Sequence, residues 1–254
     1  MNLLKKAGLA ATTAAIGMCA ASGAAQAAFP NYVDCPREDP RVLVCVDIQS
    51  RTGSLTIKGF SVPIGESLNI RGGLRAVGTE AEFVGATGTN GFFARPIQVP
   101  GGILGIDFPI PGNAVTARAT LVGPASNIKI STTDFGVTVP VKLKLSNPLI
   151  GPGCQIGSDD NPVVLRLITG TTNPPAPASP ISGRIGTLDP VTRTFRGNVN
   201  VDNTFAIPGA SRCGLGLGLI NGVINLKLGL PSAAGNNEMI IGNDVGLIGA
   251  RVAI

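Results

Sequence analysis

The sequence predicts an all-β protein, with antiparallel, β-sandwich-like sheets in one or two modules and at most one short helix near residues 217–228. Several segments alternate apolar and polar residues, which is typical of strands with one buried face and one solvated face. The chain contains 35 Gly and 20 Pro among 254 residues, and these separate short apolar runs as tight turns do. Hydrophobic residues make up 44% of the chain, which argues against disorder.

Residues 1–27 are expected to be a secretory signal peptide. Lys5 and Lys6 provide a positive start, a short apolar segment follows, and the small residues of 25–27 suit cleavage before Ala28. The apolar segment is shorter and richer in Ala than a membrane span, which needs about 20 strongly apolar residues. We therefore expect an exported protein with no transmembrane segment after cleavage.

A lipid anchor at Cys19 is an alternative, because the three residues before it faintly resemble a lipoprotein signal. Met18 stands where such signals have a small residue, so cleavage before Ala28 is favoured. The mature protein is then expected to be secreted, either free outside the cell or associated with the cell wall.

Residues 28–128 are expected to form an N-terminal β module. Residues 42–48 and 55–57 alternate apolar and polar side chains, and residues 50–53 between them resemble a turn, so a hairpin is predicted. Residues 115–121 show the same alternation and predict a further strand.

Residues 129–254 are expected to form a C-terminal β module, although one large sandwich over the whole mature chain also fits its length. The longest alternating run, 135–145, places apolar residues at odd positions. Pro140 within it lacks an N–H group and is expected at a bulge or on a sheet edge. Residues 195–201 alternate in the same way, and the Pro-rich stretch 171–180 is expected to be a long loop inside this module.

One segment of the second module has helical spacing. Apolar residues recur at three- and four-residue intervals from Leu219 to Leu228, with Gly229 as a stop signal and Pro231 just beyond it. Residues 215–219 alternate Leu with Gly as a strand would, so the helix competes with a strand at its start.

The mature chain has four cysteines, Cys35, Cys45, Cys154 and Cys213. An even number in an exported chain predicts two disulfide bonds, and four cysteines allow three pairings. The pairing Cys35–Cys45 with Cys154–Cys213 is favoured, because neither bond crosses between the two modules. A metal site is disfavoured because the chain has no His and no C-x-x-C motif.

Charge and composition argue against several function classes. The formal net charge is +5 and falls to +3 when the two lysines of the signal peptide are removed (5 − 2 = 3). The basic residues are dispersed and the chain has no Trp and one Tyr, so a nucleic-acid partner is not expected. The absence of His excludes the catalytic arrangements that use it as a base, and no catalytic, cofactor-binding or metal-binding residue is assigned.

Acidic residues are the remaining candidates for chemistry. The adjacent pairs 38–39 and 159–160 lie among Pro, Gly and Ser, where acids commonly cap turns; a calcium site at 159–160 is the alternative. Acids from distant strands could also form a glycosidase-like pair.

The expected function is that of a secreted, disulfide-stabilised, non-catalytic β protein without a cofactor, located in the extracellular space or cell envelope. An adhesive, structural or ligand-binding role is expected, with an envelope component or a protein as partner. Candidate contact segments are residues 92–93, 103–110 and 214–220. The alternative is a carboxylate-dependent extracellular hydrolase.

The motifs NPLIGPGCQIGS (147–158) and LGLPSAAGNN (228–237) resemble a family of uncharacterised secreted proteins of actinobacteria. The resemblance covers roughly residues 139–240. It implies a secreted bacterial protein and the Cys154–Cys213 pairing, and it assigns no catalytic residue.

Overall fold

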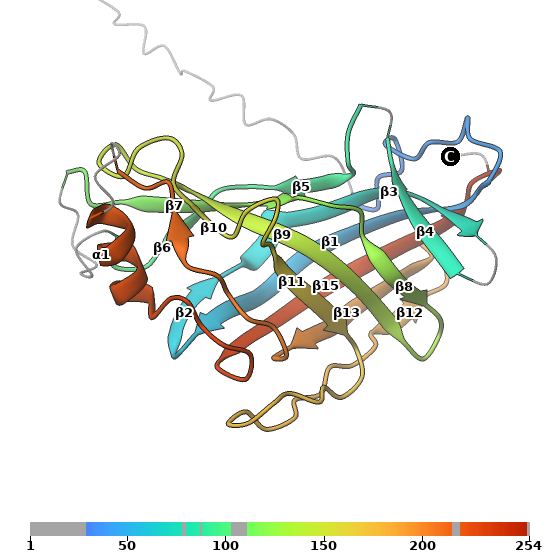
Figure 1. Cartoon of the computed structure of the whole chain (residues 1–254). Coiled ribbons are helices and arrows are strands. Elements are labelled where there is room, and N and C mark those ends of the chain that lie inside the picture. Colours follow the sequence, from blue (N-terminus) through green and yellow to red (C-terminus); the bar gives the residue numbers. More distant parts are fainter. Residues whose placement is uncertain (1–28, 78–79, 87, 103–110, 215–218, 253–254) are drawn as a thin grey trace, which may run out of the picture.

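The computed structural model describes residues 29–77, 80–86, 88–102, 111–214 and 219–252. The expected signal peptide with Cys19, and the candidate contact segment 103–110, lie outside these residues. Within them the all-β prediction is confirmed, with a single α-helix beside an extensive antiparallel sheet (Figure 1). No helix in these described ranges combines the length and apolarity needed to cross a lipid bilayer.

The elements follow one another along the chain without a long helical region. The first half gives β1 (Val42–Ile57), β2 (Phe60–Pro63), the 3₁₀ turn η1 (Gly65–Ser67), β3 (Leu68–Val77), β4 (Glu80–Gly85), β5 (Phe92–Ala94), β6 (Ile97–Val99), β7 (Val115–Leu121) and β8 (Ser126–Ile130). The second half gives β9 (Phe135–Ser146), β10 (Gln155–Ile156), β11 (Val163–Ile168), β12 (Thr187–Asp189), β13 (Thr194–Asp202), β14 (Ala210–Ser211), α1 (Leu219–Leu228) and β15 (Asn237–Gly249).

The sheet closes on itself instead of forming two facing layers. Its order runs β11-β13-β15-β1-β3-β4-β8-β9, and β9 pairs in turn with β11, which completes the ring. Strands of the two expected modules, 28–128 and 129–254, form two adjoining arcs of this ring, because β1 pairs with β15 and β7 pairs with β9. The ring therefore has a continuous inner face to which both halves of the chain contribute.

Strand β9 follows the alternation predicted for residues 135–145. Its odd-numbered residues are apolar and face the interior of the ring. The even-numbered residues from Thr138 to Lys144 face outward. Pro140 is neither at a bulge nor on an edge. It lies where the neighbour of β9 changes from β8, which ends its pairing at Thr138, to β7, which begins its pairing at Val141. The missing N–H group is therefore not required by either neighbour.

The hairpin predicted around residues 50–53 is wrong. Residues 42–57 form one long strand, β1, with a bulge at Arg51 where the register against β15 skips one residue. The bulge shifts the inward-facing positions from even numbers (Val46) to odd numbers (Leu55). The tight turn comes later, at Lys58 and Gly59, whose positive φ values of 46° and 89° suit the two-residue connection to β2.

The helix predicted near 217–228 is confirmed as α1, and Gly229 ends it with a φ of 66°. Two asparagines attach α1 to the neighbouring backbone. Asn225 accepts a hydrogen bond from the backbone N–H of Ala210 in β14 at 2.6 Å, and Asn221 accepts one from the N–H of Cys213 at 2.8 Å. These bonds hold α1 at one end of the ring, at the left of Figure 1.

Both disulfide bonds join the pairs favoured from the sequence. Cys35 bonds to Cys45 across a separation of 10 residues, and Cys154 bonds to Cys213 across 59 residues. The first ties the segment before β1 to the outer side of that strand. The second ties the segment after β14 to the start of β10, close to α1.

The segment before β1 covers a buried carboxylate on the outside of the ring. Asp47 in β1 accepts hydrogen bonds from the backbone N–H of Asn31 at 2.7 Å and from Nδ2 of Asn69 at 2.8 Å. Tyr32 packs nearby, and burial together with the charge of Asp47 raises the pKa of its phenol to about 12. Burial also raises the pKa of Asp47 above its ordinary value, and its hydrogen bonds only partly offset this.

The raised pKa of Asp47 predicts a specific pH dependence of stability. The folded protein binds the proton more tightly than the unfolded chain, whose carboxyl titrates near 3.8. Acidification from neutral pH through the folded pKa, down to about 3.8, therefore stabilises the fold through this group. We expect the free energy of unfolding of the wild type, relative to that of Asp47→Asn, to increase over this range in urea titrations. Asp160→Asn, at an exposed carboxylate, is the control; a wild-type advantage that shrinks on acidification would contradict the prediction.

Candidate ligand-binding cavity

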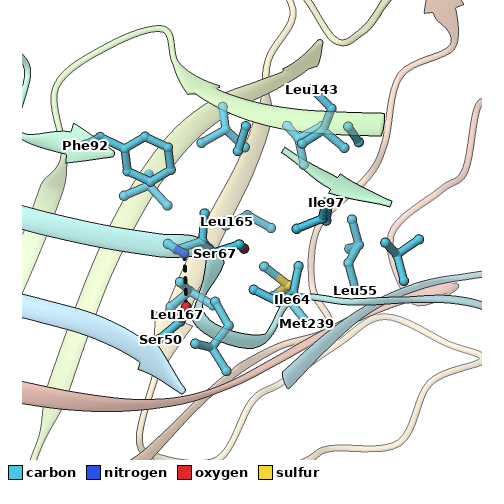
Figure 2. A pocket seen from close by; sticks show the side chains of 18 of the residues that line it. Ser50, Leu55, Ile64, Ser67, Phe92, Ile97, Leu143, Leu165, Leu167 and Met239 are labelled. Carbon is cyan, nitrogen blue, oxygen red and sulfur yellow. Dashed lines mark hydrogen bonds between the residues drawn. The ribbon is translucent and has the colours of Figure 1, made fainter. Parts of the chain in front are cut away.

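The ring encloses a cavity of about 310 Å³. It is lined by the inward-facing residues of β1, β3, β9, β11 and β15, with further side chains from β2, β5, β6, β7 and α1. Figure 2 shows how side chains from distant parts of the chain converge there, among them Leu55, Phe92, Leu143, Leu165 and Met239. The cavity is therefore a product of the closure of the sheet and belongs to no single segment.

The wall of the cavity is almost entirely apolar. Each of the odd-numbered residues 135–145 on β9 contributes an apolar side chain, and so do Leu165 and Leu167 on the neighbouring β11. Ala117 and Ala119 on β7 present small side chains, so the space beside them is left open. A wall of this composition favours an apolar ligand, because water there would find few hydrogen-bond partners.

Three polar side chains in the wall, those of Ser50, Asn200 and Asn243, form hydrogen bonds within the protein. The Ser50 hydroxyl donates to the carbonyl oxygen of Gly65 at 2.5 Å. It also accepts a hydrogen bond from the backbone N–H of Leu68 at 3.0 Å, which is the dashed line in Figure 2. Asn243 donates to Oδ1 of Asn200 at 2.8 Å, and Asn200 donates to a backbone carbonyl at 3.2 Å. These contacts stabilise the joints between strands.

The end of the cavity next to α1 is open to solvent. Val223 of α1 and Leu149, which follows β9, both line the cavity and are 52% and 66% exposed. Ile220 and Ile224 on the same helix face inward and pack against the main apolar core. The helix thus forms part of the wall and part of the mouth at this end.

A wider, more open cavity of about 820 Å³ continues the interior at the opposite end of the ring. Val46 of β1 and Val245 of β15 line the main cavity, and Val44 and Leu247 line the outer one two residues further along the same faces. Leu74 of β3 lines both. We call this second space the outer cavity.

No carboxylate lines either cavity among the residues that the structure describes. The paired acids of the sequence lie elsewhere: Asp159 is exposed and pairs with Lys142 at 2.6 Å, and Asp39 bonds to Arg41, whose hydrogen bonds lower the pKa of Asp39. The described ranges also contain no group of three or more side chains that could hold a metal ion.

The contact segments expected from the sequence are divided by the fold. Phe92 lines the cavity, whereas Phe93 lies on the outside beneath the guanidinium group of Arg71 at 4.5 Å. In the segment 214–220, Ile220 lines the cavity; residues 215–218 are outside the described part of the chain.

Apart from Phe92 and Ile220, which belong to expected contact segments, the cavity-lining residues have the sequence pattern of ordinary core. A signal was present in the long run on β9, whose inward positions after Phe135 are medium-sized aliphatic residues without Trp or Tyr to fill the centre of a ring. Comparison of the chain with protein-family models, curated proteins and solved structures finds no match. The geometry of the cavity therefore carries the functional argument.

Proposed function

We propose that this protein is a secreted, non-catalytic carrier that holds an apolar, lipid-like molecule inside its closed sheet. The main observation in support is the cavity of about 310 Å³ in the middle of an apolar interior. Protein interiors are close-packed, with few voids larger than a water molecule, whereas sites for small molecules fall in the range of roughly 300–1,000 Å³. A space of this size and composition is suited to a ligand rather than to packing alone.

Several features support an extracellular setting. The two disulfide bonds suit an oxidising compartment, and residues 1–27 have the pattern of a secretory signal. The resemblance to secreted actinobacterial proteins in residues 139–240 points the same way. The hydrolase alternative has less support, since it needs two carboxyl groups in one cleft at about 5–10 Å, and no described residue brings one to either cavity.

A fluorescence assay tests the proposal directly. N-phenyl-1-naphthylamine, a neutral dye that brightens in apolar surroundings, is added to the mature protein, and hexadecanol is then titrated as a competitor. We expect the dye to brighten on binding and hexadecanol to displace it at micromolar concentration. Absence of both dye binding and competition would refute the proposed function.

Filling the cavity is expected to weaken binding. Ala117 on β7 is buried, lines the cavity and pairs with Leu145 of the neighbouring strand β9. In Ala117→Phe the new ring enters the empty space, so the affinity for the dye should fall at least tenfold, which corresponds to about 1.4 kcal/mol. The matched control is Ala233→Phe, at an exposed position outside the cavity. Circular dichroism checks that both variants fold; equal dye affinity in the two folded variants would contradict the prediction.

A further inference from the structure

Three basic side chains line the outer cavity, Arg75 from β3, Lys129 from β8 and Arg193 from the turn before β13. No acidic residue accompanies them in the described lining. Arg193 lies at the rim beside Leu247, because its carbonyl oxygen accepts a hydrogen bond from the N–H of Leu247 at 3.1 Å. The open end of the apolar interior is therefore bordered by positive charge.

The three cations differ in how far they are already neutralised. Arg75 is engaged with Glu82, to which it donates two hydrogen bonds of 2.8 Å. Lys129 has its Nζ atom 4.0 Å from Asp134, and its side chain is 71% exposed. Arg193 is paired with no carboxylate among the described residues, and its charge acts on the neutral phenol of Tyr32. Lys129 and Arg193 are thus the two cations that retain capacity for an external anion.

The outer cavity and the main cavity share part of their walls. Leu74, Ile128, Ile130 and Lys129 line both. The apolar side chains of Ile128 and Ile130 pack with Phe135 and Val46 in one cluster, while Lys129 between them in sequence is exposed at the rim. An elongated molecule that fills the main cavity and extends past these residues would bring its outer end to Lys129 and Arg193.

We propose that the ligand is an amphiphile with one apolar tail and an anionic head group, bound with the tail inward. The tail occupies the main cavity and the head group lies in the outer cavity, in contact with Lys129 and Arg193. This inference rests on the proposed function, and it adds the chemical class and the orientation of the ligand. A charged head requires an electrostatic partner at a wet rim, where it keeps part of its hydration, and the outer cavity provides both.

Two other cations line the main cavity, the exposed Arg95 between β5 and β6 and Lys227 of α1, and Lys227 is the one that lies deep enough to be distinguished from this pair. Lys227 of α1 lines the main cavity near its opposite end, and its Nζ atom is buried. An amphiphile bound in the reverse orientation would place its head there. The mouth at α1 is bordered by exposed Leu149 and Val223, so the rim at that end suits a tail better than a charge.

The test compares three ligands that share a sixteen-carbon chain: hexadecanoate, hexadecanol and hexadecyltrimethylammonium. Each displaces the neutral dye from the mature wild type, from Lys129→Gln/Arg193→Gln, from Lys227→Gln and from Arg166→Gln. Arg166 is an exposed cation on β11 that lines neither cavity, so its variant shows the effect of losing one positive charge away from both cavities, as Lys227→Gln does inside the main one.

In the wild type we expect hexadecanoate to bind about tenfold more tightly than hexadecanol at low salt, and the cationic ligand to bind most weakly. The double variant should lose this preference, because its affinity for hexadecanoate should fall about tenfold relative to its affinity for hexadecanol, while Lys227→Gln and Arg166→Gln retain it. Equal affinity for hexadecanoate and hexadecanol, or a preference that survives the double variant or disappears in Lys227→Gln, would overturn the orientation and leave the carrier function standing. Failure of all three ligands to bind would overturn the carrier function itself.

Discussion

Removal of the Cys154–Cys213 disulfide is expected to lower the free energy of unfolding by about 4 kcal/mol, the value that the loop-entropy model gives for its 59-residue separation. The bond restricts the unfolded chain, so its loss increases the entropy of the unfolded state. Both cysteines are buried, at 0% and 2% exposure, and the double replacement by Ala leaves no free thiol to form other bonds. Urea unfolding followed by circular dichroism measures the change.

The second disulfide provides the matched control. Cys35 and Cys45 have a sequence separation of only 10, for which the same model gives about 3 kcal/mol. The Cys154 and Cys213 bond also holds the backbone next to Asn221 of α1, so its removal should weaken dye binding as well, whereas removal of Cys35–Cys45 should not. A larger loss of stability or of dye binding on removing Cys35–Cys45 would contradict this assignment.

Asp202→Ala is expected to cost about 3 kcal/mol of stability. Asp202 is fully buried and accepts hydrogen bonds from the backbone N–H of Arg166 at 2.6 Å and from the N–H and hydroxyl of Thr204 at 2.8 Å and 2.7 Å. Ala would leave these donors without their acceptor, and each unsatisfied buried group costs roughly 1–3 kcal/mol.

The position of Asp202 gives this residue a role in closing the ring. Strands β11 and β13 share a single register pair, Ile168 with Val201, so the bond from Arg166 to the Asp202 carboxylate supplements a short seam. Asp160→Ala, at an exposed site, is the control and should change the urea midpoint little. Equal midpoints for the two variants would show that the seam does not depend on this carboxylate.

The local pattern of the strands was predictable from the sequence, and their long-range arrangement was not. Alternation in residues 135–145 predicted both the strand β9 and the face that it buries. Whether that face meets a solid core or a hollow depends on the pairing of β9 with β11 and of β1 with β15, which bring together residues far apart in the chain. The cavity could therefore not be read from any one segment.

The error at residues 50–53 has an identifiable cause. Apolar positions change from even to odd numbers between Ile48 and Leu55, and a turn between two strands explains that change as well as a bulge does. The pairing with β15 decides between a turn and a bulge, because this one strand pairs with β1 on both sides of Arg51. The basic rim was equally hidden, since Lys129 and Arg193 are distant in sequence and line the same space only at the open end of the ring.

The bulge at Arg51 makes β1 sensitive to its length. Because the register skips Arg51 alone, deletion of that residue would leave every later residue of β1 on its present face and with its present partner in β15. One extra residue beside the bulge would instead turn every later position over. Leu55 and Ile57 would then face outward and Thr56 would enter the apolar interior. The geometry of β1 therefore tolerates substitutions and the loss of Arg51, whereas an insertion near Arg51 would expose its apolar face.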